Sequence, residues 1–267
     1  MVARSRCYQD DIRVPPEGVE ARVTSRSMSD LPLTTRSWGN GTRRALLVHG
    51  ITSDSGGWWR VGPAVADLGY EVVAADLRGH GQSPHASSYR LEDYAGDLLA
   101  LGTDWELVIG HSLGGATVLA AAGARSTFAL RLALVDPWLV NDGLPPPDRE
   151  EYGAVETATE IAAKNPNWEA EDVSAKAAAL PAVDRELIDQ TFAQKWNLIP
   201  VLDDVTVPTL LLAADPQLGS LTTQAVGERA AATNALVRFE TIYGGGHSMH
   251  RDAWDDFWGV LSDFTGG

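Results

Sequence analysis

Cysteine is almost absent from this sequence, since Cys7 is the only one among 267 residues. An intramolecular disulfide is therefore excluded, and no Cys/His spacing typical of a zinc site is present. No apolar run approaches the ~20 residues that a membrane-spanning helix needs. Residues 1–14 also lack the apolar block of a secretory signal. We therefore expect a cytoplasmic protein with no membrane partner and no metal or other cofactor.

Basic residues are also scarce, with 21 Lys and Arg against 36 Asp and Glu and a formal net charge of −15. Such an excess of negative charge repels the phosphates of nucleic acids and of anionic membranes, so a nucleic-acid partner is not expected. A hydrophobic content of 44% is ordinary for a globular protein and excludes general disorder. The length suits one main domain that carries an inserted subdomain.

Short apolar runs recur along the chain and alternate with segments of helical periodicity. The runs are residues 45–48, 71–75, 106–109, 132–135, 208–213 and 237–242. Before them, the turn signal Gly39-Asn40-Gly41 predicts an antiparallel strand or hairpin. Buried strands that alternate with helices predict an α/β fold with a mostly parallel central sheet and helices on both faces. Functional residues are then expected at the carboxyl ends of the strands.

Residues 137–207 break this alternation. Their sequence shows no convincing strand and three helical stretches separated by prolines and polar residues. In the third stretch Leu187, Ile188, Phe192 and Trp196 fall on one helical stripe, which must pack on the main domain or line a pocket. We expect a helical cap at 137–207, inserted into a core built from 1–136 and 208–267.

The strongest chemical signal is the run Gly110-His111-Ser112-Leu113-Gly114, which follows an apolar strand and precedes a helix rich in small residues. A serine on so tight a strand-to-helix turn has its hydroxyl lifted clear of the backbone, and glycines two residues before and after avoid collisions with the neighbouring chain. The helix N-terminus directs free N–H groups, including that of Leu113, toward a forming oxyanion. Ser112 is thus a candidate nucleophile.

Four motifs in this order resemble the α/β-hydrolase superfamily of serine hydrolases with a nucleophile elbow and a helical cap. They are Val48-His49-Gly50, Asp76-Leu77-Arg78-Gly79-His80-Gly81-Gln82-Ser83, the Ser112 turn, and Gly244-Gly245-Gly246-His247. The resemblance covers residues 45–264 and implies the α/β-hydrolase fold, with the cap inserted after the strand that the family counts as its sixth. It says little about the substrate.

The resemblance implies a catalytic triad in the chain order Ser, acid, His. His247 fits the position of the base, with His250 as a weaker alternative. Two carboxylates compete for the acid: Asp215 after the run 208–213, which is the usual family position, and Asp136 after the run 132–135. We favour Asp215, although Ala213 and Ala214 stand where the family often has glycine.

The same resemblance implies that the backbone N–H groups of Ile51 and Leu113 form the oxyanion hole. His49 is expected to hold its loop by hydrogen bonds and not to transfer protons. The turn at 76–83 is expected to brace the floor of the site, and His80, His85 and His111 are expected to be structural or exposed.

The tryptophans of the loop after His49 and of the cap are candidates for substrate binding or for core packing. They are Trp58, Trp59, Trp138 and Trp196. Both roles suit large aromatic side chains, and the sequence leaves the choice open.

These features together predict a cofactor-independent hydrolase that cleaves a carboxylic ester or lactone of a mostly apolar small molecule through an acyl-enzyme. Epoxide and haloalkane hydrolysis are disfavoured because relatives with those activities carry Asp at the position of Ser112. Hydrolysis of a carbon–carbon bond would use the same triad, and a non-catalytic small-molecule receptor could retain it. The sequence does not separate these alternatives or give the oligomeric state.

Overall fold

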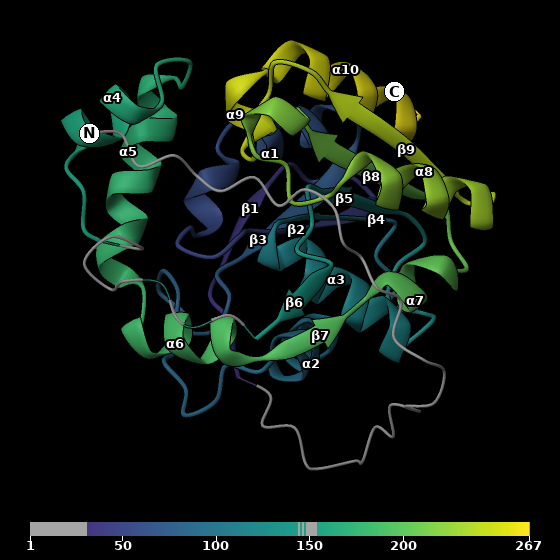
Figure 1. Cartoon of the computed structure of the whole chain (residues 1–267), viewed down its shortest axis with the longest axis horizontal. Coiled ribbons are helices and arrows are strands. Elements are labelled where there is room, and N and C mark those ends of the chain that lie inside the picture. Colours follow the sequence, from purple (N-terminus) through teal and green to yellow (C-terminus); the bar gives the residue numbers. More distant parts are fainter. Residues whose placement is uncertain (1–30, 144, 146, 148–153, 267) are drawn as a thin grey trace.

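The computed structural model describes residues 31–143, 145, 147 and 154–266. A sheet of seven described strands lies at its centre (Figure 1). The strand order is β1-β3-β2-β4-β5-β8-β9, and every pairing except that of β1 with β3 is parallel. The strands are β1 (Thr35–Trp38), β2 (Arg43–Val48), β3 (Tyr70–Ala75), β4 (Leu107–His111), β5 (Leu132–Val135), β8 (Thr209–Ala214) and β9 (Val237–Ile242). The predicted fold class is therefore confirmed.

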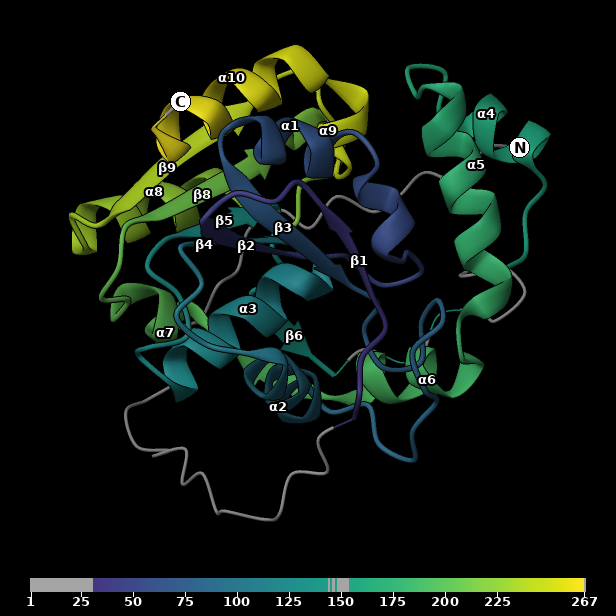
Figure 2. The ribbon, with the colours of Figure 1, turned by 180° about the vertical axis from the view of Figure 1, so that it is seen from behind.

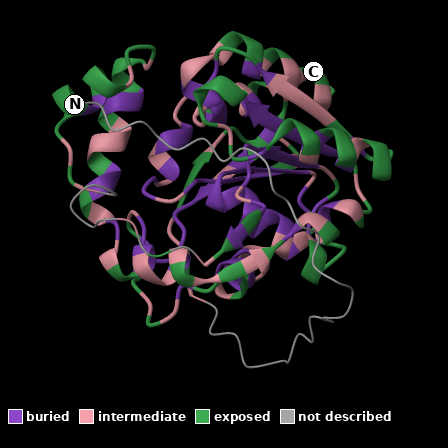
Figure 3. Ribbon diagram, in the orientation of Figure 1, coloured by how far each residue is buried: buried purple, intermediate pink, exposed green. Residues whose placement is uncertain are grey.

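Helices cover both faces of this sheet (Figure 2). One face carries α1 (Val61–Asp67), α9 (Met249–Asp252) and α10 (Trp254–Thr265), and the other carries α2 (Leu91–Leu101), α3 (Leu113–Ala124) and α8 (Gln224–Thr233). The central strands are buried along their length (Figure 3), which explains why they are apolar on both faces. α10 instead buries only one stripe, with Phe257 and Leu261 inward, as its amphipathic sequence predicts.

The predicted antiparallel strand exists, but it does not form a hairpin with the strand that follows it. β1 pairs with β3 and so lies at the edge of the sheet, while β2 runs between β3 and β4. The turn between β1 and β2 contains Gly39 at φ +69°, where a Cβ would lie 2.5 Å from the carbonyl oxygen of Tyr70. The turn signal and the antiparallel strand are therefore confirmed, and the alternative of a hairpin is wrong.

The segment between β5 and β8 begins where the sequence predicted an insertion, directly after residues 132–135. Its described residues contain two short strands and four helices, with a 3-10 turn between the second and third helices. They are β6 (Val140–Asp142), α4 (Ala158–Lys164), α5 (Ala170–Ala179), η2 (Leu180–Ala182), α6 (Arg185–Ala193), β7 (Lys195–Asn197) and α7 (Ile199–Asp203). β6 and β7 pair antiparallel, so the expectation of no strand here was wrong. The division into a core and a 137–207 cap stays a prediction.

Two halves of this segment are packed differently. We call α4, α5 and η2 the lid, and β6, α6, β7 and α7 the inner half. The inner half joins the main core through Leu187, Ile188 and Leu202, whereas the lid has a separate small cluster of its own, built on Ile161, Val173 and Leu180. In Figures 1 and 2 helices α4 and α5 of the lid stand at the side of the molecule, and the inner half crosses its lower part, where α2 and α3 also lie.

None of the helices among the described residues is long and apolar enough to cross a membrane. Cys7 and residues 1–14, on which the expectation of a cytoplasmic protein partly rests, lie outside the described residues.

Candidate active site

Ser112 occupies the sharp turn that joins β4 to α3. Its φ of 54° and ψ of −119° are strained for a residue with a side chain. The two flanking glycines are needed for the reason predicted: a Cβ on Gly110 would lie 2.7 Å from the carbonyl oxygen of Gly114, and a Cβ on Gly114 would lie 2.3 Å from that of Val48. The sequence around Ser112 therefore folds into the predicted elbow.

His247 follows β9 and points toward the carboxyl end of β5. Its Nδ1 lies 2.7 Å from Oδ2 of Asp136, whose side chain is fully buried. The other oxygen of Asp136, Oδ1, accepts hydrogen bonds from Ser220 Oγ at 2.8 Å and from the backbone N–H of Thr222 at 2.9 Å. The backbone N–H of Leu221 lies 3.0 to 3.1 Å from both oxygens. A carboxylate that accepts this many hydrogen bonds can be buried in its charged form.

The structure thus corrects the choice of acid, because Asp136 and not Asp215 contacts the imidazole. Asp215 caps the 3-10 turn η3 (Pro216–Leu218), where it accepts from the N–H of Gln217 at 2.8 Å and from the N–H of Gly244 at 2.9 Å. Those two bonds hold the pKa of Asp215 below its usual value. Asp215 therefore ties the end of β8 to the loop that carries His247, but it does not reach the ring.

The two predicted oxyanion donors come from the elbow itself and from the loop after β2. Leu113 is the first residue of α3, so its N–H has no acceptor within the helix. Ile51 begins the turn after β2, and among the described residues no acceptor for its N–H is recorded. The preceding Gly50 packs so closely that a Cβ there would lie 3.0 Å from the Cβ of Ser112. This arrangement suits an oxyanion hole, although its catalytic use stays a prediction.

His111 and His250 are buried beside His247 and do not contact Asp136. The Nε2 of His111 donates to the carbonyl oxygen of His247 at 2.8 Å, which joins the nucleophile turn to the histidine loop. The ring of His250 packs against Trp58 at 5.1 Å. Burial lowers the pKa of both imidazoles well below the usual value, so they are neutral near pH 7.

Two further histidines have the structural and exposed roles expected. His49 Nδ1 donates to the carbonyl oxygen of Gly50 at 2.8 Å, and its Nε2 accepts from the N–H of Leu77 at 3.0 Å, so the ring braces its own loop. His85 has a 64% exposed side chain.

The turn at residues 76–83 is architectural, as predicted. The guanidinium of Arg78 makes two 2.6 Å hydrogen bonds to the buried carboxylate of Asp97 on α2. Asp76 accepts from the N–H groups of Ser55 at 2.7 Å and Gln82 at 2.9 Å, which links this turn to the loop after β2. These contacts hold the loops together. Among the described residues, no hydrogen bond joins a side chain of this turn to the ring of His247.

The four tryptophans have different surroundings. Trp58 is 1% exposed and belongs to the core between the sheet and α10, so its assignment to a substrate pocket is replaced by core packing. Trp59 is half-buried, and its indole N–H donates to Asp172 of the lid at 2.8 Å.

Trp138 lies next to the nucleophile, since its backbone N–H donates to the carbonyl oxygen of Ser112 at 3.1 Å. Its ring contacts that of Trp196 at 5.0 Å, and Trp196 lies on β7 beyond the end of α6.

Within the part of the chain that the structure describes, no three His, Cys, Asp or Glu side chains are grouped so as to hold a metal ion. The residues that sequence reasoning missed are the donors to Asp136, namely Ser220, Leu221 and Thr222. No local motif marks them, because two of the three act through the backbone.

The family model described as the Alpha/beta hydrolase family matches residues 45–260. This chain belongs to that family. Lipase LipV of Mycobacterium tuberculosis is 34% identical over 108 residues, which are 39% of this chain and 41% of the lipase. The chain therefore spans less than half the length of that relative. The 2-(acetamidomethylene)succinate hydrolase of Mesorhizobium japonicum is 26% identical over 211 residues, covering 69% of this chain and 74% of the relative.

Solved structures of the family have the same fold. The enol-lactonase of Burkholderia xenovorans LB400 superposes with a TM-score of 0.74 at 20% identity, covering 91% of this chain and 99% of the lactonase. At that identity the likeness concerns the fold alone, and the chemistry must be argued from the residues of this chain.

Proposed function

We propose that this protein is a cofactor-independent serine hydrolase that cleaves a carboxylic ester or lactone of a mostly apolar small molecule. The observation that supports it most is the 2.7 Å contact between His247 Nδ1 and the buried carboxylate of Asp136, next to the strained turn of Ser112. A carboxylate on Nδ1 fixes the tautomer in which Nε2 carries no proton and can act as a base.

In the proposed reaction, the hydroxyl oxygen of Ser112 attacks the substrate carbonyl while Nε2 of His247 takes the hydroxyl proton. Asp136 stabilises the imidazolium that forms, and the N–H groups of Ile51 and Leu113 hold the oxyanion. Collapse breaks the bond to the alkoxy group, which leaves with the proton from His247. Water, activated by the same imidazole, then hydrolyses the acyl-enzyme and regenerates Ser112.

The substrate class is inferred from two features. Trp138 places its backbone against Ser112 and its ring in an aromatic group with Trp196 and Phe192, which favours an apolar substrate. A lipase stands among the relatives described above, and its name is consistent with attack on an ester carbonyl.

The direct test is labelling with a fluorophosphonate, followed by turnover assays with short-chain nitrophenyl esters and lactones of several ring sizes. We expect the label on Ser112 and measurable ester or lactone turnover. Ser112→Ala should lose the label and at least ~10³-fold of the rate, with an unchanged circular dichroism spectrum. Labelling without turnover of any ester or lactone would contradict the proposal and favour a receptor or another hydrolase class.

A further inference from the structure

One side chain of the lid reaches the loop that carries the predicted oxyanion donor Ile51. Nζ of Lys176, on α5, donates to the carbonyl oxygen of Thr52 at 2.8 Å and to Oγ1 of Thr52 at 2.7 Å. The sequence contains only three lysines, and the other two, Lys164 and Lys195, are exposed. Lys176 is instead half-buried, and no carboxylate among the described residues forms an ion pair with it.

Thr52 is held in a conformation that a threonine rarely adopts. Its φ is +61°, in the left-handed region that disfavours β-branched side chains, and the residue is 7% exposed. Such strain persists only where the surroundings hold it. The two hydrogen bonds from Lys176 bind both the backbone and the side chain of this residue, so they are suited to hold it.

The conformation of Thr52 matters because it directly follows Ile51 in the same two-residue turn. A change in the backbone at Thr52 moves the chain on which the Ile51 N–H is carried. Stabilisation of an oxyanion depends on donors that are already aimed before the reaction starts, and a displacement of about 1 Å can cost ~10²-fold in rate.

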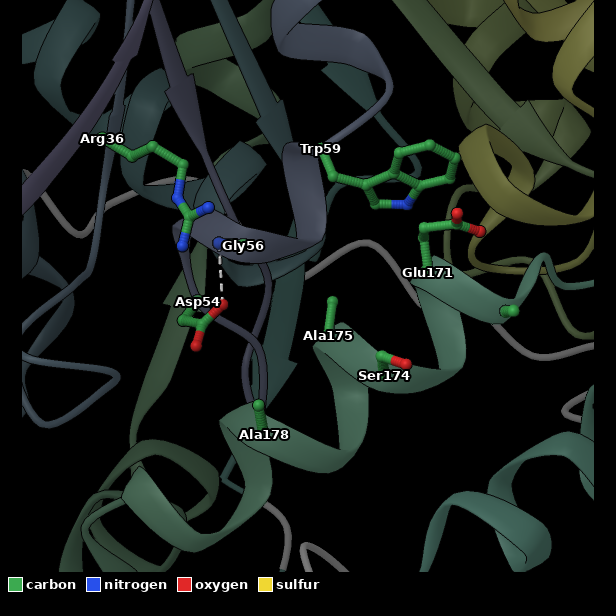
Figure 4. A pocket seen from close by; sticks show the side chains of 9 residues that line it. Arg36, Asp54, Gly56, Trp59, Glu171, Ser174, Ala175 and Ala178 are labelled. Atoms are coloured by element: carbon green, nitrogen blue, oxygen red, sulfur yellow. Dashed lines mark hydrogen bonds between the residues drawn. The ribbon is translucent and has the colours of Figure 1, made fainter.

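The lid is fastened to the body mainly by polar side chains. Besides Lys176, Trp59 donates to Asp172 of α5 at 2.8 Å, and Trp168 of the lid donates to Asp252 at 2.7 Å. Between α5 and η1 (Ser55–Trp58) lies a hollow of about 500 Å³ (Figure 4), whose α5 side is lined by small side chains such as Ser174, Ala175 and Ala178. On this side the lid therefore does not close onto the body by apolar packing.

We propose that Lys176 is a positioning residue, which holds Thr52 and thereby the oxyanion loop in its active conformation when the lid is docked. The inference rests on the proposed hydrolase function and deepens it, because it makes docking of α5 a condition for a complete oxyanion hole. Lys176 acts through Thr52 and does not itself touch the reacting atoms.

The protonation of Lys176 allows a second, independent test of this proposal. Burial and, to a smaller extent, the charge of Arg251 on α9 lower the pKa of this ammonium to about 8, while Glu156 before α4 and Asp54 before η1 act in the opposite direction. The ammonium therefore loses its proton as the pH rises through about 8, and a neutral amine is a weaker hydrogen-bond donor. A guanidinium at this position would stay charged.

The main experiment compares Lys176→Met with Lys195→Met, which makes the same chemical change on exposed β7. Lys176→Met should lower kcat for a short-chain ester about 10- to 100-fold with KM within about 3-fold, because the oxyanion forms only after substrate binds. Lys195→Met should match the parent. The loss caused by Lys176→Met should be smaller in the Thr52→Gly background, since glycine adopts a positive φ without strain.

A second arm keeps the proposal testable if Lys176→Met does not fold. The parent kcat should fall as the pH rises through about 8, and Lys176→Arg should lose that fall while the fluorophosphonate still labels Ser112. A parent-like kcat for folded Lys176→Met, an equal loss in both Thr52 backgrounds, or the same alkaline fall in Lys176→Arg would each overturn the proposal. An inactive parent would instead count against the proposed hydrolase function.

Discussion

The carboxyl ends of β5 and β8 lie side by side in the sheet, and each is followed by an aspartate, yet the two side chains have opposite environments. Asp136 after β5 is fully buried and contacts His247. Asp215 after β8 is half-buried, and the hydrogen bonds that its side chain accepts from described residues come from two backbone N–H groups. Two equivalent positions at one edge of a sheet therefore offer very different carboxylates.

The difference arises from how the chain continues after each strand. After β8 the chain makes the turn η3, passes Gly219 at φ +89°, and returns with Ser220, Leu221 and Thr222 against Asp136. The loop after β8 thus does serve the acid of the site, but it does so by supplying hydrogen-bond donors. The placement of donors, and not the presence of a carboxylate at a strand end, decides which aspartate can be buried in its charged form.

Among the substitutions that test this difference, Asp136→Asn should have the largest effect on kcat. Three donors face Oδ1, so the amide oxygen must take that side and the amide NH₂ must face Nδ1 of His247. The imidazole then needs its other tautomer, in which Nε2 is protonated and cannot accept the proton of Ser112. We expect kcat for an ester to fall by ~10²- to 10⁴-fold with little change in KM.

Asp215→Asn is the matched control for that measurement, with the same chemical change on the neighbouring strand. Steady-state kinetics of both variants, with thermal unfolding curves to confirm folding, decide the assignment. If Asp215→Asn were the inactive variant and Asp136→Asn retained most of the rate, the observed contact would not be the one used in catalysis.

A smaller effect is expected when one donor to the buried acid is removed. Ser220→Ala deletes the 2.8 Å hydrogen bond to Oδ1 but leaves the N–H groups of Leu221 and Thr222 in place. The carboxylate is held less firmly, so we expect kcat to fall by about 3- to 10-fold. Ser262→Ala, on α10 away from the site, should show no change in kcat. A fall as large as that of Asp136→Asn would mean that Ser220 has a direct catalytic role.

Much of this molecule could be predicted because its signals are local or follow a strict period. The apolar runs gave the parallel strands, and the spacing of Gly110, Ser112 and Gly114 gave the elbow, since only glycine fits those close backbone contacts. His247 was assigned through the family resemblance, which places the base in the loop after the last strand. For the strands and the elbow, the physical reason lies within a few residues of the position concerned.

The parts that failed depend on contacts between distant residues. Asp136 and Asp215 both follow apolar strands, and donors 84 and 86 residues away from Asp136 distinguish them. Trp196 matched a helical stripe, but α6 ends at Ala193 and Trp196 pairs with Asn141 in the small sheet. No sequence pattern pointed to Lys176, because the positioning role proposed for it depends on the strained backbone of Thr52, 124 residues earlier.

The smallest expected effect, on stability and not on chemistry, belongs to Asp215→Asn. The amide oxygen can still accept from one N–H of the pair Gln217 and Gly244, so the turn η3 and its link to the His247 loop are weakened but not lost. The pKa of Asp215 is lowered in the folded state, so its stabilising effect is present above the unfolded pKa of about 3.8 and is lost as the pH falls through the lower folded value. We therefore expect Asp215→Asn to lower Tm slightly at pH 7, and the difference from the parent to disappear at the acid end of a pH series. A Tm difference that persisted with Asp215 protonated would show that the side chain stabilises the loop without its charge.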